Sequence, residues 1–328
     1  MSDKRKILGL LPVLLLVALA GLYFGSAALS PEAFFSALTG RGDESLRVIL
    51  WQLRFPRVVA GVLAGLGLSV AGVLLQSVTA NELAGPNIIG INSGAGLAVI
   101  LVLTVAPAAG KWLPLAAFIG AFGAAMCILT AADRLSGSRS SILLIGIAIT
   151  TLLNAVISFL TLLDEAVLAQ YNHFTVGSLK AVYLDELLIP AAVIALAFLA
   201  SMALSNQLGV LCLGDSAAAA LGVRVKRLRI MALACAAAGA AAVVSFAGLL
   251  GFVGLVVPHI ARRLVGERPG KMLPCAALVG AIIVVLADLL GRTLFAPSEL
   301  PVGILMSVVG APYFLFLLCR RRKYAGIS

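Results

Sequence analysis

Residues 230–261 read IMALACAAAGAAAVVSFAGLLGFVGLVVPHIA, a run of 32 residues without lysine, arginine, aspartate or glutamate. A single helical crossing of a bilayer needs only ~20 apolar residues, so this run is too long for one span. It contains three glycines from Gly248 onward and then Pro258, and these are residues at which a helix breaks. The stretch therefore predicts two consecutive membrane helices, near residues 230–250 and 252–265.

The rest of the chain has the same character. Of its 328 residues, 62% are hydrophobic and 12% are charged, and the mean hydropathy is +1.12. Soluble domains are about 25% charged, and a soluble fold could not hide this much apolar surface. The composition excludes a soluble enzyme, a nucleic-acid-binding domain and a disordered protein. The unbroken apolar runs also exclude the alternating strands of a membrane barrel.

The predicted fold class is therefore all-α, a polytopic membrane bundle of ten transmembrane helices in one domain, residues 1–328. The predicted spans lie near residues 7–28, 58–80, 88–110, 112–132, 140–163, 187–206, 230–250, 252–265, 272–295 and 300–319. Glycine and alanine pairs at four-residue spacing, such as Gly61 with Gly65, predict close contact between helix backbones.

The positive residues predict the orientation of this bundle, because cationic segments next to membrane spans remain in the cytosol. Lys4–Lys6 precede the first span and Arg320–Lys323 follow the last, so both ends are expected inside, which requires an even number of spans. Residues 133–139, 213–229 and 262–271 are then cytosolic as well. In this orientation 17 of the 24 lysines and arginines lie inside and seven lie outside.

The first apolar run allows a second interpretation, a cleaved signal peptide that ends near Ser26. Its 22 residues are long for a signal peptide, so we favour a retained first helix.

Ionisable residues inside the predicted spans are scarce. Asp288 and Arg292 lie four positions apart, the favourable order for a pair within one helix. No series of buried acids is present for a proton relay, so the energy for any transport is expected to come from a partner. Milder polar residues that include Gln76, Asn81 and Asn154 either line a path or make hydrogen bonds between helices.

The sequence predicts no metal and no cofactor in this chain. The five cysteines and two histidines show no metal-binding spacing, and no Walker A motif is present. The chain is therefore not expected to be an enzyme or to hydrolyse ATP itself.

Two inner loops differ from ordinary connections. Residues 213–223 read LGDSAAAALGV, in which Asp215 or Ser216 can cap a short helix that Gly222 ends. This loop presents either a compact knob to a cytosolic partner or an ordinary basic loop. The other is the turn at 81–86, NELAGP, which has no cation although it lies on the positive side. We expect that turn to be packed inside protein, as a constriction at the cytoplasmic mouth.

Five short motifs follow one another in a distinctive order along the chain. They are Leu53-Arg54-Phe55-Pro56-Arg57, Gly72 to Gln76 followed by Asn81 to Pro86, Gly251 to His259, Asp288 with Arg292, and Glu299 to Gly303 followed by Gly310-Ala311-Pro312. With these motifs the sequence resembles, over nearly its whole length, the FecCD-type permeases. These are the membrane subunits of type II ABC importers for iron-siderophores, haem and vitamin B12.

The resemblance implies roles for three groups of residues. Coupling to the ATPase is implied for Gly214, Asp215, Ser216, Ala220, Leu221, Gly222 and Val223. Docking of a substrate-binding protein is implied for Arg54, Arg57 and Arg292. A gate role is implied for Asn81, Leu83, Ser140 and Ser141. For Gln76 and Asn154 the pathway role is a prediction from their polarity inside the spans. Glu82 departs from the family pattern, in which this position is usually proline, so the gate turn is expected to differ in shape or charge.

The resemblance also implies the partners. These are a second permease subunit, identical or a sibling, two ATP-binding subunits that hold ATP and Mg, and a periplasmic or lipoprotein substrate-binding protein, with membrane lipid and no nucleic acid. The sequence therefore predicts a permease subunit in a bacterial inner membrane that imports an iron-siderophore, with haem and cobalamin left open. The alternatives are an ion-coupled secondary transporter acting alone and a non-transporting scaffold.

Overall fold

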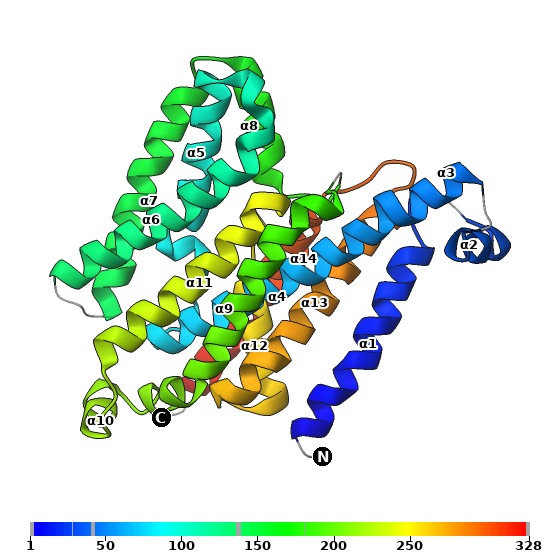
Figure 1. Cartoon of the computed structure of the whole chain (residues 1–328). Coiled ribbons are helices and arrows are strands. Elements are labelled where there is room, and N and C mark those ends of the chain that lie inside the picture. Colours follow the sequence, from blue (N-terminus) through cyan, green and yellow to red (C-terminus); the bar gives the residue numbers. More distant parts are fainter. Residues whose placement is uncertain (1–2, 28, 41–42, 136–138, 181, 326–328) are drawn as a thin grey trace.

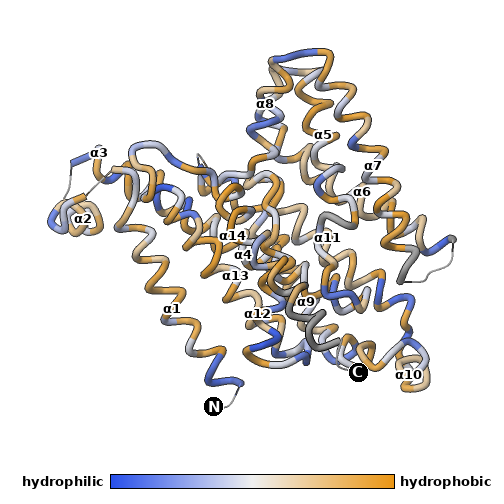
Figure 2. The backbone as a smooth tube through the Cα atoms, turned by 180° about the vertical axis from the view of Figure 1, so that it is seen from behind, coloured by the Kyte–Doolittle hydropathy of each residue, from blue (hydrophilic) through white to orange (hydrophobic). Residues whose placement is uncertain are grey.

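A computed structural model describes residues 3–27, 29–40, 43–135, 139–180 and 182–325 (Figure 1). Within these ranges the chain folds into helices and forms no strand, which confirms the predicted all-α class. Figure 2 shows long apolar stretches along the helices, whereas the polar residues lie mainly at the two ends of the bundle.

The helices have the following bounds in chain order. They are α1 (Asp3–Tyr23), α2 (Pro31–Leu38), α3 (Glu44–Arg47), the π-helix η1 (Val48–Arg54), α4 (Phe55–Thr79), the 3₁₀ helix η2 (Pro86–Ile89), α5 (Ile91–Val105), the 3₁₀ helix η3 (Pro107–Trp112), α6 (Leu113–Leu135), α7 (Arg139–Thr161), α8 (Glu165–Val176), α9 (Leu184–Leu211), α10 (Asp215–Ala220), α11 (Val225–Ala247), α12 (Val253–Val265), α13 (Pro269–Thr293) and α14 (Val302–Ala325).

Helix α4 is the centre of the bundle. It packs against α9, α11, α12 and α13, and residues around its whole circumference are buried. Its sequence explains this position, because alanine and glycine on several faces let neighbouring backbones approach closely. Helices α5 to α8 form a group on one side of α4, and α1 lies on the other side against α13 (Figure 1).

Small residues hold the closest contacts between these helices. A side-chain carbon added at Gly65 of α4 would collide with the backbone of α13 at Gly280. Additions at Gly72 and Gly94 would collide with the backbones of α12 and α6. Lipid supplies no hydrophobic drive between helices, so this backbone packing and its van der Waals contacts hold the core together. The close backbone contact predicted at Gly65 agrees with this geometry.

The apolar run at 230–261 is broken in the structure. Helix α11 ends at Ala247 and α12 begins at Val253. The break is made by two residues with left-handed backbone, Gly248 at φ +67° and Phe252 at φ +64°. Glycine adopts this conformation without cost, whereas phenylalanine does so only where the surrounding fold holds it. Phe252 packs against Gly310 of α14, where any side chain would collide with its ring.

Seven helical stretches of the described chain are long and apolar enough to cross a membrane. Two further helices, α5 and α14, contain shorter apolar stretches, and α12 lies over another predicted span. The number of crossings therefore stays a prediction. The largest difference in bounds is at the second span, where one helical stretch runs over Glu44–Thr79 and extends well before the predicted start.

Candidate functional site

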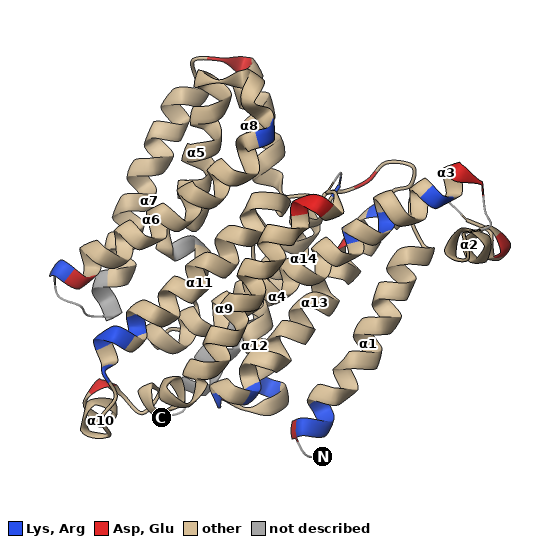
Figure 3. Cartoon of the chain, in the orientation of Figure 1, with Lys and Arg blue, Asp and Glu red and all other residues tan. Residues whose placement is uncertain are grey.

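Charged residues gather at the two ends of the bundle (Figure 3). The start of α1, α10 and the start of α11 lie together at one end, here called the inner end after the predicted orientation (Figure 1). This end carries most of the basic residues. The opposite, outer end holds α2, α3 and α8 and carries most of the acidic residues. Three arrangements at these ends concern the predicted functional residues.

At the outer end, the Arg54 side chain caps a neighbouring helix. Arg54 ends the π-helix η1 and is 5% exposed. Its Nη1 donates hydrogen bonds to the carbonyl oxygens of Leu22, at 3.0 Å, and Tyr23, and Nη2 donates to Ala27. The last carbonyls of a helix lack partners within the helix, so the guanidinium satisfies the end of α1.

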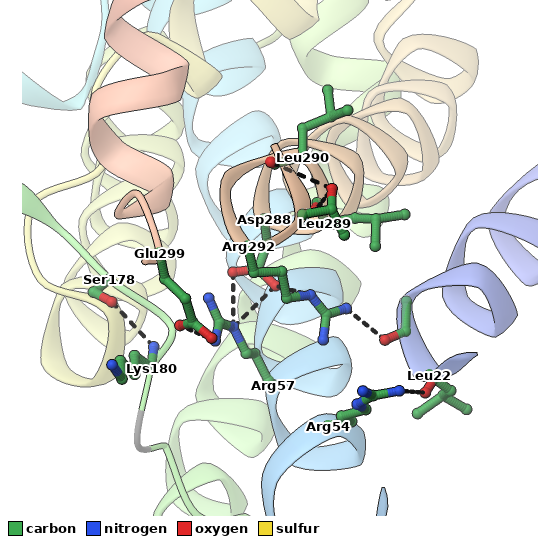
Figure 4. A network of polar contacts seen from close by, with 12 residues as sticks. Leu22, Arg54, Arg57, Ser178, Lys180, Asp288, Leu289, Leu290, Arg292 and Glu299 are labelled. Carbon is green, nitrogen blue, oxygen red and sulfur yellow. Dashed lines mark hydrogen bonds and ion pairs between the residues drawn. The ribbon is translucent and has the colours of Figure 1, made fainter. Parts of the chain in front are cut away.

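Arg57 lies one turn further along and pairs with two carboxylates. Its Nε donates to both oxygens of Asp288, at 2.9 and 3.0 Å, and its Nη1 donates to Glu299 Oε2 at 2.9 Å (Figure 4). Asp288 on α13 also faces Arg292, whose Nε lies 3.5 Å from Asp288 Oδ2. The predicted pair within α13 is therefore present, as part of a larger buried network.

Glu299 comes from the loop between α13 and α14 and closes this network toward the outside. Its side chain is 15% exposed, against 4% for that of Asp288. Burial raises the pKa of the Glu299 carboxyl. The hydrogen bond from Arg57 and the positive charge of Arg57 lower this pKa by more, so it lies below its ordinary value of 4.5. The group is therefore ionised at neutral pH.

These side chains border a cavity of about 180 Å³ at the outer end. Four segments form its walls. They are the residues that follow α1, the helical stretch formed by η1 and the start of α4, the segment before α9, and the loop that carries Glu299. Its charged lining residues are Arg54, Arg57, Lys180, Arg292 and Glu299. Lys180 is exposed, whereas Arg54, Arg57 and Arg292 are at most 9% exposed.

The structure thus brings the three predicted docking arginines together, but as buried groups with partners inside the chain. Glu299 is the member that sequence reasoning missed as a partner. Arg57 and Glu299 are 242 positions apart, and a single sequence carries no signal for such a pair. The sequence indicated only that Arg57 and Glu299 both fall at the predicted outer ends of spans.

At the inner end, α10 stands out from the bundle as a short helix. Gly214 occupies the N-cap position at φ +107°, in place of the expected Asp215 or Ser216. Asp215 instead lies in the first turn and pairs with Arg229 of α11. Gly222 follows the helix at φ +81° and ends it as predicted. Asp215 thus joins α10 to α11 through this ion pair.

Leu221 is one of two exposed leucines in the loop 213–223, and the other is Leu213. Leu221 is 66% exposed, whereas Ala218 within α10 is fully buried. A groove of about 400 Å³ lies beside it. The lining is partly apolar and partly basic, made by Leu204, Gln207, Leu221, Gly222, Val223, Arg224, Arg227, Leu228 and Met231. An exposed leucine next to such a groove offers an apolar anchor within a cationic surface.

The gate turn connects α4 to η2 and is tied to α12. Asn81 accepts a hydrogen bond from the Leu83 N–H at 2.9 Å, which shapes the turn. Glu82 pairs with Arg262 at 3.2 Å, and Arg262 also donates to Gln76 at 3.4 Å. The departure from proline at position 82 therefore adds an ion pair between the turn and α12.

Of the other predicted gate residues, Leu83 lies in this turn, and Gln76 lies on α4 and is linked to the turn through Arg262. Gln76 is 3% exposed and donates to the Leu255 carbonyl at 3.4 Å, so it joins α4 to α12. Leu83 is 38% exposed and borders a cavity of about 110 Å³ next to Phe252. Asn154 lies on the exposed side of α7. The side chains of Ser140 and Ser141 lie outside the described residues.

Comparisons with known proteins agree along nearly the whole chain. Residues 13–320 match the model of the FecCD transport family. The chain is 38% identical to the Fe(3+)-citrate import system permease protein YfmE of Bacillus subtilis, over 97% of this chain and 96% of that protein. It is 37% identical to the hemin transport system permease protein HmuU of Yersinia pestis, over 98% and 97%.

A solved structure gives the same picture. The fold matches an inward-facing conformation of a metal-chelate type ABC transporter with a TM-score of 0.85 and 29% sequence identity. The match covers 97% of this chain and 99% of the other chain.

Proposed function

The chain belongs to the FecCD transport family and is a membrane-spanning permease of an ABC transport system, and we propose that it imports an iron chelate of the siderophore class. The proposed cargo is inferred from the similarity, over nearly the full length of the chain, to permeases named for ferric citrate and hemin. Two ATP-binding subunits supply the energy, a second permease subunit completes the path, and a substrate-binding protein delivers the chelate.

The alternative, an ion-coupled secondary transporter, finds no support in the buried charges. Asp288 is the one buried carboxylate among the described residues, and it is paired with Arg57 and Arg292. A coupling site needs a carboxylate that can take up and release an ion during transport. Ion pairs with two arginines tie this carboxylate between α4 and α13, which favours a structural role.

The inner end suits contact with an ATPase. It presents α10 with the exposed Leu221 and a basic groove beside it. In the proposed orientation both termini and residues 213–229 and 262–271 lie in the cytosol of a bacterial cell, in line with the positive-inside rule. The outer end, with its arginine network, then faces the binding protein.

The cargo prediction is tested with a strain that lacks this permease. Uptake of radioactive ferric siderophores and ferric citrate should fall to background and return when the gene is restored. Haem and cobalamin uptake, measured in the same cells, serve as the controls for cargo class. Unchanged iron-chelate uptake combined with a loss of haem or cobalamin uptake would contradict the siderophore assignment.

The orientation is tested by labelling single cysteines in a background without the native cysteines. A membrane-impermeant maleimide added to intact cells should label a cysteine at position 180 and leave one at position 268 unlabelled. The reason is that Lys180 borders the outer cavity, whereas Arg268 lies between α12 and α13. Labelling at 268 in intact cells would show that the break at 248–252 does not separate two crossings.

A further inference from the structure

The gate turn at residues 81–86 begins with a hydrogen-bonded β-turn. The Ala84 N–H donates to the Asn81 carbonyl oxygen at 3.1 Å, and the Leu83 N–H donates to Asn81 Oδ1 at 2.9 Å. Glu82 is therefore the second of the four turn residues, a position at which the fixed φ of proline stabilises the common turn types. Glutamate lacks this backbone restraint, so the place of the turn depends on the contacts of its side chain.

Arg262, in the last turn of α12, makes such a contact. Its Nη1 lies 3.2 Å from Glu82 Oε1, and the two side chains are 20% and 33% exposed. Its Nη2 donates to Gln76 Oε1 at 3.4 Å, while Gln76 Nε2 donates to the Leu255 carbonyl oxygen near the start of the same helix. The buried Gln76 on α4 thereby orients the guanidinium toward the turn. A partly buried ion pair is screened less by water and salt than one at an open surface.

The two ends of the gate turn are packed differently against α12. A side-chain carbon added at Gly254 would lie only 2.9 Å from Pro86 Cδ, so the Pro86 end is held by close packing. Leu83 is 38% exposed and borders a cavity of about 110 Å³ that also reaches Phe252. The Leu83 end therefore has space to move into, and the neighbouring ion pair restrains it.

We propose that Glu82, Arg262 and Gln76 form a releasable latch that holds the gate turn on α12, and that release of this latch lets Leu83 move into the cavity during transport. The hydrogen bonds to Asn81 fix the shape of the turn, whereas the latch fixes its place. An ion pair breaks and re-forms within a transport cycle, which the covalent restraint of a proline does not. The transport step rests on the proposed function, but the latch itself does not.

Hydrogen exchange read by mass spectrometry tests the latch in the purified permease–ATPase complex in nanodiscs. The amides of Leu83 and Ala84 donate within the turn, so exchange in the peptide that contains them reports local opening. Glu82→Gln keeps the size of the side chain and removes its charge. Exchange at these amides should rise about three- to tenfold, as expected for the loss of one partly buried ion pair.

Three variants control this result. Glu267→Gln removes a carboxylate that lies 3.8 Å from Nε of the same Arg262 but is 79% exposed and outside the turn, and it should leave exchange unchanged. Arg262→Glu should speed exchange, since it places two carboxylates side by side. Adding Glu82→Arg to it restores a pair with reversed charges, to which the Gln76 amide adapts by turning over, and exchange should return toward that of the wild type.

Uptake of radioactive ferric chelate into proteoliposomes with the ATPase and the binding protein tests the transport step. Glu82→Gln should slow ATP-driven uptake severalfold, because a loosened turn spends less time in the position that the path requires. The charge-reversed double variant should recover part of the rate, and Glu267→Gln should transport normally. Co-purification of the ATPase and the Tm should stay unchanged, which shows that the complex is assembled and folded.

The outcomes separate the latch from the proposed function. Unchanged exchange in Glu82→Gln, or no recovery in the double variant, would show that the ion pair does not hold the turn. Faster exchange with normal uptake would refute release of the latch as a step of transport and leave the proposed function intact. Absence of uptake in the wild-type complex would refute the proposed function, whereas the exchange result would stand.

Discussion

Asp288→Ala should be the most damaging single substitution at the outer end. It leaves Arg57 and Arg292 close together and buried, with Glu299 as the one carboxylate of the network still present. Removing one member of a buried ion pair costs about 3–5 kcal/mol, because the remaining charge is left uncompensated. The Tm of the purified permease, followed by intrinsic fluorescence in detergent, should therefore fall clearly below that of the wild type.

Two further variants show whether the loss of charge balance causes the expected fall in Tm. Asp43→Ala removes an exposed outer carboxylate that makes no capping hydrogen bond, and it should leave the Tm nearly unchanged. Combining Asp288→Leu with Arg57→Met removes one charge of each sign and should recover part of the lost stability, since apolar residues of similar volume replace buried pairs well. Equal Tm values for Asp288→Ala and Asp43→Ala would refute the structural role of the network.

Leu221→Asp should separate the permease from its ATPase without unfolding it. Leu221 is 66% exposed in the isolated chain, and substitutions at exposed sites change folding stability little. In the proposed contact the new carboxylate is buried without a partner, at a cost of several kcal/mol. A cost of about 3 kcal/mol corresponds to roughly a hundredfold weaker association.

The measurement is co-purification of the ATPase with tagged permease, together with ATP hydrolysis by the assembled complex. Leu221→Met keeps an apolar side chain of similar volume and should co-purify normally. Normal co-purification and transport with Leu221→Asp would show that α10 is not the site of contact.

Apolar runs predicted the helices well because each span must bury about the same length of chain in lipid. The break at 248–252 was predictable for the same reason. The apolar run was too long for one crossing, and its glycines indicated where the first helix could end. Helix α10 was also predictable from a run of alanines between two glycines. These are local signals, and they need no knowledge of what packs against the segment.

The network at the outer end was not predictable in this way. The second span was expected to start at residue 58, after the charges at Arg54 and Arg57, because charges normally mark the end of a membrane helix. The helical stretch instead continues outward through both arginines. Asp288, 231 positions away, and Glu299 make the burial of Arg57 possible. Backbone carbonyls at and after the end of α1 do the same for Arg54. Such pairs depend on the tertiary fold.

The same limit applies at the gate turn and at α10. Glu82 was expected to change the turn, and the structure shows how, through an ion pair with Arg262 on a helix far along the chain. At α10, Asp215 was expected to cap its own helix, which is the commonest use of that residue at a helix start. The nearby Arg229 pairs with it instead. In each case the acidic residue pairs with a cation on another helix.

The central claim is that this permease moves an iron chelate with energy from a separate ATPase. Its most direct test is uptake of radioactive ferric siderophore into proteoliposomes that contain the permease, with or without the ATP-binding subunits. The binding protein is added outside and ATP is enclosed on the side of α10. Uptake should occur only with ATP and the ATPase present and should be lost with Leu221→Asp. Uptake driven by a proton or sodium gradient in vesicles that lack the ATPase would contradict the account.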